Sequence, residues 1–430
     1  MIRHPDTVIK GGRLVDASGE QSGDILISDG HIVAVGQDLQ GEILIDAGGC
    51  IVSPGLVDLH AHLRQPGKEE TETIASGARA AVLGGYTAVL AMPNTTPTID
   101  CAAVVREVLE LGRASVCDVH TTGAITVGRA GEQLAPMAEM AALGVKVFTD
   151  DGTGVQDDRL MRRAMEYASG LGLTLAQHCE VNSLSEGTCM HEGEWSARLG
   201  LPGQPSESEE LMVMRDIALA RLTGAKIHFQ HMSTAGSAAL IAAAKAKGMS
   251  ITAEAAPHHF TLTDACCEQY DATFKVHPPL RAQSDLEAIK NALAAGSLDA
   301  IATDHAPHAA EDKELPFDQA PPGMLGLEYA LALAFSELVD GGEMTEAEVL
   351  AAMSWRPAAI AGMDNHGQRL VVGVPANLCV IDPSQRWVID ATGGVSLSRN
   401  VPYVGKEVRG KVRHTIVFGE VVVRDGEVQR

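Results

Sequence analysis

Histidine and aspartate side chains follow several short apolar runs in the middle of this chain. The first run, residues 57–62, ends on His60 and His62, which are two positions apart and point to the same side of an extended strand. The residues that follow the other runs are Asp150, Asp151, His178, His231 and Asp304. Imidazoles and carboxylates brought together from separate strand ends would form a hydrolytic site for two metal ions at the mouth of a barrel.

The donor types indicate which metal such a site would bind. Neutral imidazoles with carboxylates suit zinc, and manganese or cobalt can take its place. A single strand-end histidine is more often structural than a ligand, so the prediction depends on four strands that carry His or Asp at the same height. Asp304 can ligate a metal through one oxygen and accept a proton through the other, which is the role of the base in metal-assisted hydrolysis.

Two metal ions need a bridging anion, and the fourth apolar run offers two kinds of candidate. A carboxylate of the Asp150-Asp151 pair bridges directly. Lys146, on the same run, could bridge only after CO₂ converts its amine into a carbamate anion. The residue pattern by itself leaves both choices open.

The elements that would position these residues form a repeating strand–loop–helix pattern over residues 55–365. Its eight predicted strands are 56–62, 86–93, 116–123, 145–150, 173–180, 226–233, 250–258 and 299–305. Amphipathic stretches between them predict helices at 73–83, 158–170, 209–222, 237–246 and 284–295. Apolar strands that alternate with helices are typical of parallel sheets covered on their outer face, so we predict an α/β protein with a (β/α)₈ TIM-like barrel.

Both ends of the chain have a different texture, with short strands and glycine-rich turns. Residues 1–54 predict strands at 7–10, 24–28, 31–36 and 43–46, and Asp29-Gly30 predicts a hairpin turn. Residues 366–430 predict strands at 376–381, 386–389, 414–418 and 420–424. Since neither end has enough strands to cover its own edges, we expect residues 1–54 and 366–430 to pair into one small β-sandwich domain.

Composition limits the partners and the compartment. A net charge of −23 argues against nucleic acid and anionic membranes as partners, so an anionic substrate would need local arginine or metal charge. The eight cysteines contain no CxxC pair, which is typical of reduced thiols in the cytosol. The sequence starts without a signal-peptide pattern and has no apolar run long enough to span a bilayer, so we predict a cytoplasmic protein.

Four motifs together resemble the cyclic amidohydrolase branch of the amidohydrolase superfamily, and most closely the dihydroorotases of the long bacterial type (class I). They are DLHAHLRQPG at 58–67, AMPNT at 91–95, FTDDG at 148–152 and ATDHAPH at 302–308. The resemblance covers nearly the whole chain. It implies a metal-dependent barrel with a composite β domain, two zinc ions per subunit, and reversible cyclisation of N-carbamoyl-L-aspartate to L-dihydroorotate in pyrimidine biosynthesis.

The resemblance also implies a role for each matching residue. The ligands of the two zinc ions would be His60, His62 and Asp304 for the first and His178 and His231 for the second, with Asp151 as the bridge. Asp304 would also be the catalytic base and acid. The residues that would contact the anionic substrate are Arg64, Asn94, His277, His308, Pro322 and Gly323. The irregular segment 309–324, which follows Asp304, would be a lid over the substrate.

Two departures from the family and two alternatives go with this hypothesis. His277 occupies a position where the family commonly has Asn, and Lys146 lies near the position of the carboxylated lysine of hydantoinases and allantoinases. One alternative is therefore a dihydropyrimidinase, hydantoinase or allantoinase. The other is an inactive, metal-free partner of aspartate carbamoyltransferase, which the intact set of ligand residues opposes. The resemblance also implies a homo-oligomer and leaves association with that carbamoyltransferase open.

Overall fold

Eight parallel strands form the core of the protein in a computed structural model that describes residues 6–429. They are β6 (Leu56–Ala61), β7 (Tyr86–Ala91), β8 (Asp118–Thr121), β9 (Val147–Phe148), β10 (Thr174–Gln177), β13 (Lys226–Phe229), β14 (Ile251–Ala255) and β15 (Ala300–Ile301). Each lies inside one of the eight strands predicted from the sequence. The observed strands are shorter than the predicted ranges at one or both ends.

The eight strands close into a ring. β6, β7 and β8 form one sheet, and β9, β10, β13, β14 and β15 form the other in that order. Parallel bridges between Gly123 and Phe148 and between Ala61 and His305 join the two sheets at both seams. At the second seam the His62 amide donates to the His305 carbonyl over 2.8 Å. The predicted (β/α)₈ barrel is confirmed.

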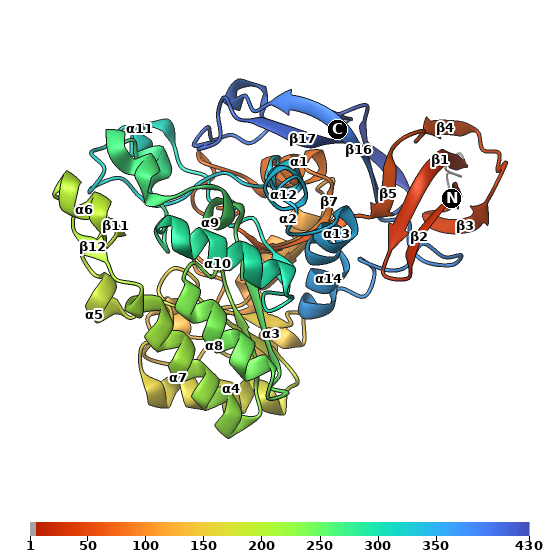
Figure 1. Ribbon diagram of the computed structural model, residues 1–430. Coiled ribbons are helices and arrows are strands. Elements are labelled where there is room, and N and C mark those ends of the chain that lie inside the picture. Colours follow the sequence, from red (N-terminus) through yellow and green to blue (C-terminus); the bar gives the residue numbers. More distant parts are fainter. Residues whose placement is uncertain (1–5, 430) are drawn as a thin grey trace.

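Helices cover the outside of the barrel, as Figure 1 shows. The main ones are α1 (Ile74–Leu83), α2 (Ala102–Arg113), α3 (Met137–Ala141), α4 (Asp158–Gly170), α7 (Glu207–Thr223), α8 (Ala235–Lys245), α10 (Gln283–Ala294), α12 (Ala330–Ala334), α13 (Glu346–Met353) and α14 (Trp355–Ala361). The local sequence explains where a helix begins and which of its faces is buried. Thr73 caps α1 by accepting the Ser76 amide, and α2 buries Val104, Val105 and Val108 on one face.

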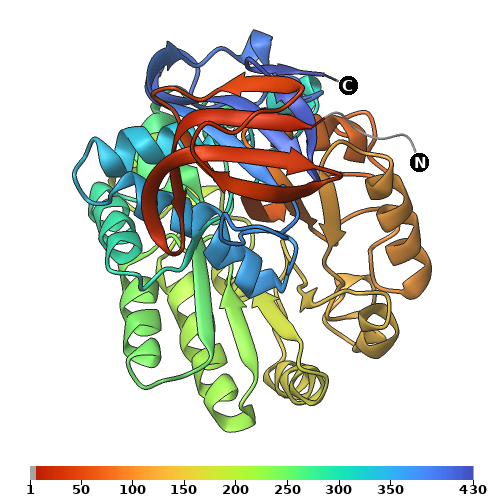
Figure 2. The same ribbon diagram turned by 90° about the vertical axis from the view of Figure 1, so that its right-hand side faces the viewer.

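Strands from both ends of the chain form one nine-stranded sheet system beside the barrel (Figure 2). Its members are β1 (Thr7–Asp16), β2 (Gly19–Ser28), β3 (His31–Gly36), β4 (Ile43–Asp46), β5 (Ile51–Pro54), β16 (Leu378–Val388), β17 (Glu407–Val417), β18 (Glu420–Arg424) and β19 (Glu427–Val428). The two ends meet where β16 pairs antiparallel with β5. The predicted β-sandwich made from both termini is confirmed. The first five residues of the segment 1–54, and Arg430, lie outside the described residues.

One predicted turn is present in the terminal sheet, whereas two predicted strand ends are not. Asp29 and Gly30 both have positive φ, 45° and 80°, as a tight turn between β2 and β3 requires. The predicted end of the first strand at residue 10 is wrong. A shift of register between Ile9 and Gly12 absorbs one extra residue, so β1 continues through Gly11-Gly12 to Asp16. The predicted strands 376–381 and 386–389 overlap the two ends of one strand, β16, which has a register shift between Asp382 and Arg386.

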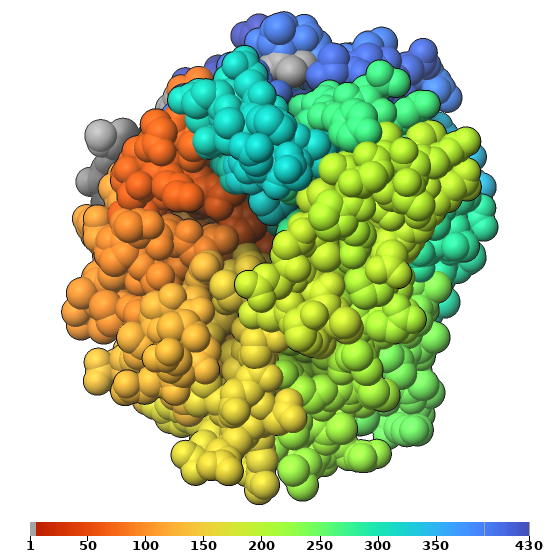
Figure 3. Space-filling view, turned by 90° about the vertical axis from the view of Figure 1, so that its left-hand side faces the viewer, coloured from red at the N-terminus to blue at the C-terminus, as the bar shows by residue number. Residues whose placement is uncertain are grey.

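Short elements gather over the carboxyl end of the barrel, at the left of Figure 1. They are α5 (Asn182–Ser185), β11 (Met190–His191), α6 (Glu194–Leu199), β12 (Gly203–Gln204), α9 (Pro257–Thr261) and α11 (Ala310–Lys313). Figure 3 looks onto this face and shows a hollow between the cyan segment that contains α11 and the yellow-green segment that contains α6. No helix within residues 6–429 is long and apolar enough to cross a membrane.

Candidate metal centre and substrate cavity

One carboxylate lies among four imidazoles at the carboxyl ends of the strands. Asp151 Oδ1 is 3.3 Å from His60 Nε2, 3.6 Å from His178 Nδ1 and 3.7 Å from His231 Nε2. Asp151 Oδ2 is 3.6 Å from His62 Nε2. The five side chains are almost fully buried and form two groups of potential metal ligands that share Asp151. A carboxylate with this placement can bridge two cations.

Asp304 completes the cluster from β15. Its Oδ1 is 3.2 Å from His62 Nε2 and 3.6 Å from His60 Nε2, whereas its Oδ2 faces His258 Nε2 at 3.8 Å. The backbone at Asp304 and His231 has φ values of 46° and 36°, which non-glycine residues rarely adopt. Such strain is retained at functional sites where the surrounding structure imposes it.

The nitrogen and oxygen atoms of this cluster are better placed to bind metal ions than to form hydrogen bonds with one another. His60 Nε2 and Asp151 Oδ1 are buried, face each other, and have no hydrogen-bond partner with acceptable geometry within residues 6–429. His178 Nδ1 and His231 Nε2 approach to 2.9 Å, so two ring nitrogens converge beside the same carboxylate. Buried polar atoms usually have partners, and a cation between these atoms would provide them. The set of buried histidines and aspartates is therefore that of a metal site.

Neighbouring side chains fix which nitrogen of each imidazole faces the centre. His60 Nδ1 lies 2.9 Å from Glu254 Oε1, and the other oxygen of Glu254 lies 2.9 Å from His228 Nε2. Burial opposes ionisation of Glu254, yet the contacts with His228 and His60 lower its pKa to about 2. A carboxylate that accepts the Nδ1 proton leaves the Nε2 lone pair of His60 free for a metal.

His62 is oriented in the same way by Asn94, whose Oδ1 accepts from His62 Nδ1 over 2.9 Å. Asn94 was expected to contact substrate, and its amide nitrogen remains available for that purpose. Glu254 was missed by the sequence analysis. A lone charged residue inside the apolar strand β14 was the signal that could have identified it.

The two aspartates of the Asp150-Asp151 pair have separate surroundings. Asp150 Oδ1 accepts the amides of Ile125 and Thr126 at 2.8 and 3.0 Å, so this carboxylate holds the loop after β8. Arg129 donates to the Asp151 main-chain carbonyl over 2.9 Å and holds the adjacent backbone. Only Asp151 reaches the histidines.

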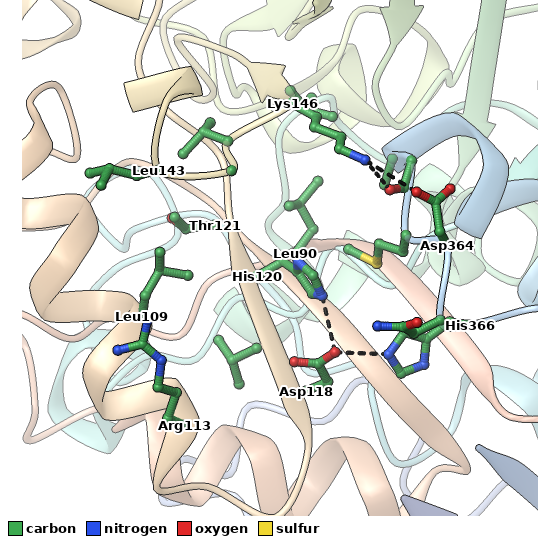
Figure 4. Close-up of a pocket in the computed structure, with 18 residues that line it drawn as sticks. Leu90, Leu109, Arg113, Asp118, His120, Thr121, Leu143, Lys146, Asp364 and His366 are labelled. Carbon is green, nitrogen blue, oxygen red and sulfur yellow. Dashed lines mark hydrogen bonds and ion pairs between the residues drawn. The ribbon is translucent and has the colours of Figure 1, made fainter. Parts of the chain in front are cut away.

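Lys146 lies at the other end of β9. Its Nζ donates to the Gly362 carbonyl over 2.6 Å and lies 3.7 Å from Asp364 Oδ2 (Figure 4). The side chain is 53% exposed, whereas Asp151 is buried. The geometry therefore favours Asp151 over Lys146 as the bridging anion.

A cavity of about 150 Å³ adjoins the metal cluster. All six residues expected to contact substrate line it, together with His62, Asp151, His178, His231 and Asp304. Arg64 is buried there, and burial lowers the pKa of its guanidinium to about 10, so it still carries a positive charge at neutral pH. Its Nε donates to the Pro307 carbonyl over 3.1 Å, which holds the fork in place. A fixed guanidinium in a small cavity suits a carboxylate ligand.

Glycine is required at the edge of this cavity. Gly323 has φ of 146°, and a β-carbon there would lie 2.7 Å from His308 Nε2 and 2.8 Å from Ala306 Cβ. His308 Nε2 lies 2.8 Å from the Pro322 carbonyl, and burial beside Arg64 lowers the pKa of His308 to about 2. His308 is therefore neutral and donates through Nε2 to the Pro322 carbonyl, which fixes the backbone at the edge of the cavity.

Solved structures with the same architecture define the class of protein. The L-hydantoinase (dihydropyrimidinase) from Arthrobacter aurescens matches with a TM-score of 0.89 and 25% identity, over 99% of this chain and 98% of that one. A D-hydantoinase from Thermus sp. matches with a TM-score of 0.86 and 27% identity, over 98% and 96%. With the buried histidine–aspartate cluster, this fold defines a metal-binding cyclic amidohydrolase.

Sequence relatives narrow the class. A family model described as Dihydro-orotase-like matches residues 49–237. The chain is 46% identical to a dihydroorotase of Streptomyces coelicolor over 89% of this chain and 90% of the relative. It is 45% identical to a dihydroorotase of Pelotomaculum thermopropionicum over 97% and 98%. The chain belongs to the dihydroorotase family of cyclic amide hydrolases, which serve pyrimidine biosynthesis.

Proposed function

We propose that this protein uses two zinc ions to interconvert N-carbamoyl-L-aspartate and L-dihydroorotate. The observation that carries the proposal is the position of Arg64, a buried cation in the same small cavity as Asp151 and Asp304. Dihydroorotate has an exocyclic carboxylate, which the ring substrates of hydantoinases and dihydropyrimidinases lack. The first ion would be held by His60, His62 and Asp304 and the second by His178 and His231, with Asp151 between them.

When bound, the ions would polarise the ring carbonyl and lower the pKa of the attacking water. The protein's own groups supply positioning and proton transfer. Arg64 and Asn94 would hold the carboxylate, in the cavity that His308 also lines, and so aim the reacting carbonyl at the cluster. Asp304 takes the proton of the attacking water and delivers it to the ring nitrogen as the carbon–nitrogen bond breaks. Ring closure runs through the same steps in reverse, with water as the leaving group.

An assay of five substrates tests this proposal. The purified enzyme is expected to close N-carbamoyl-L-aspartate and open dihydroorotate, with far lower kcat/KM for dihydrouracil, hydantoin and allantoin. A preference for a ring without the carboxylate would replace the proposed activity with that of a hydantoinase or dihydropyrimidinase. Absence of both metal and turnover would instead favour an inactive partner of aspartate carbamoyltransferase.

Arg64→Lys tests carboxylate recognition. A lysine keeps the charge but loses the fork and the Nε contact with the Pro307 carbonyl, so KM for dihydroorotate should rise by about 10- to 100-fold, the loss expected for hydrogen bonds to a charged group. Zinc content should not change, because Arg64 lies beside the proposed ligands and is not one of them. An unchanged KM would show that another group binds the carboxylate.

Segment 309–324 is proposed as the lid. It is less irregular than expected, since α11 occupies part of it. Lys313 fastens it by donating to the carbonyls of Ala272 and Pro321 over 3.0 and 2.8 Å. Lys313→Met should lower kcat/KM severalfold with zinc retained, while Glu314→Gln, an exposed change in the same segment, should have no effect. Equal kinetics for the two variants would argue that the segment is only a surface connection.

A further inference from the structure

A second histidine–aspartate cluster lies at the amino-terminal end of the barrel, opposite the cavity that contains Arg64. Asp118 is the first residue of β8, and His120, two positions later, points to the same side. His366 reaches them from the segment after α14. Figure 4 shows both imidazoles directed at the Asp118 carboxylate.

The three donor atoms already have the spacing of metal ligands. Asp118 Oδ2 is 2.9 Å from His366 Nε2 and 3.2 Å from His120 Nε2, and all three atoms lie within 4.8 Å of one another. Bonds of about 2.0–2.1 Å to zinc place neighbouring ligand atoms of a tetrahedron about 3.3 Å apart. Small side-chain shifts would therefore admit an ion.

A neighbouring hydroxyl can set the required tautomer of His366. Thr87 Oγ1 lies 3.0 Å from His366 Nδ1 and 3.5 Å from the Leu56 carbonyl. If the Thr87 hydroxyl donates to Leu56, its oxygen accepts the Nδ1 proton of His366 and the Nε2 lone pair faces Asp118. A metal-binding histidine commonly donates its other ring proton in this way. The His366 side chain is fully buried, so its orientation is fixed.

The cluster borders a cavity of about 370 Å³, which gives space for the remaining coordination positions. His120 and Asp118 are 39% and 29% exposed and provide the entry path. Lys146 lines the same cavity, but its ammonium group is held by the Gly362 carbonyl and Asp364. Repulsion of a divalent ion by Lys146 is reduced by that pairing.

We propose that Asp118, His120 and His366 bind one divalent transition-metal ion, such as zinc, and that this ion ties the barrel to the terminal β domain. The ring of His366 packs edge-on against Phe418 at 5.7 Å, and Phe418 lies in the turn between β17 and β18. An ion held by β8 and His366 links a barrel strand to this contact. Residues at the amino-terminal face of such barrels serve stability, which fits a structural ion.

Metal counting on the full-length protein tests the proposal. The wild type, His120→Ala and Asp364→Asn would be stripped with a chelator, equilibrated at micromolar free zinc, and analysed by mass spectrometry for zinc per chain. His120→Ala removes a partly exposed ligand, whereas Asp364→Asn alters the same cavity without touching the cluster. Thermal unfolding would be followed with and without zinc. Asp118→Asn, which keeps the size of the side chain, repeats the test.

We expect His120→Ala and Asp118→Asn to bind one zinc ion fewer per chain than the wild type and Asp364→Asn. Their rates at saturating zinc should stay at the wild-type level, because the proposed catalytic ligands are intact. Zinc should also raise the melting temperature of the wild type more than that of either ligand variant. Equal zinc content in all four proteins would overturn the proposal and leave Asp118 as a plain hydrogen-bond acceptor for two imidazoles. A loss of zinc in these variants without any dihydroorotate turnover in the wild type would contradict the proposed function alone.

Discussion

Asp304→Asn is expected to lower kcat for ring closure and ring opening by about a thousandfold, which lies within the range for loss of a general acid–base group. Asparagine keeps the shape of the side chain but cannot accept and return a proton. The free oxygen of Asp304 points away from His62 and His60, towards His258, and is the atom that would carry the proton. Steady-state kinetics in both directions measures the effect.

Zinc analysis of the same variant separates proton transfer from metal loss. The four histidines and Asp151 remain, so most of the zinc should stay bound. The matched change His305→Gln alters the next residue, whose ring faces Glu72 and lies outside the cluster, and should retain much more activity. If Asp304→Asn kept kcat within tenfold of the wild type while fully loaded, another group would have to move the proton.

Asp151→Ala is expected to remove nearly all activity, by at least about a thousandfold, together with most of the bound zinc. The Asp151 carboxylate lies within 3.7 Å of all four histidines. Without its negative charge, the repulsion between the two proposed cations would no longer be offset. Zinc per chain and the rate of dihydroorotate formation are the two measurements.

Lys146→Ala is the matched control for that variant, because Lys146 lies on the same strand and is the alternative bridge. Its side chain contacts Gly362 and Asp364 at the opposite end of β9, so zinc content and rate should stay at the wild-type level. A collapse of activity in Lys146→Ala, or CO₂ found on Lys146 by intact mass, would reverse the assignment of the bridge.

Most of the barrel could be predicted because local sequence patterns specify parallel strands and amphipathic helices. All eight strands and the pairing of the termini follow from apolar runs, helical periodicity and edge protection. The extent of β1 could not be predicted, since a shift of register carries the strand through Gly11-Gly12. Such a bulge depends on the partner strand and leaves no clear local signal.

The residues of the candidate site could be predicted where they follow a strand. The spacing of His60 and His62 identifies them as possible ligands by itself, while His178 and His231 are identified only when all strand ends are considered together. Glu254 was missed because its partner His60 is 194 positions away in the sequence. The choice between Asp151 and Lys146 needed the structure, because the residue pattern left both open. In the structure the Lys146 amine is held by Gly362 and Asp364, away from the histidines.

Fold similarity alone would not have selected the substrate. The solved hydantoinases share this architecture at TM-scores of 0.86 and 0.89, while relatives at 45% and 46% identity are dihydroorotases. The structural feature of this chain that suits a dihydroorotase is Arg64. Its charge is buried beside the metal cluster, and the Pro307 carbonyl holds its side chain in place. Its proposed partner is the carboxylate of dihydroorotate.

Zinc titration of the metal-stripped His120→Ala protein tests the central proposal most directly, because that background lacks the proposed structural ion. The rate of dihydroorotate formation from N-carbamoyl-L-aspartate should rise with added zinc and level off at two ions per chain. Full activity without metal, saturation at a single ion, or zinc-dependent opening of dihydrouracil with no reaction of N-carbamoyl-L-aspartate would contradict a two-metal dihydroorotase centred on Asp151.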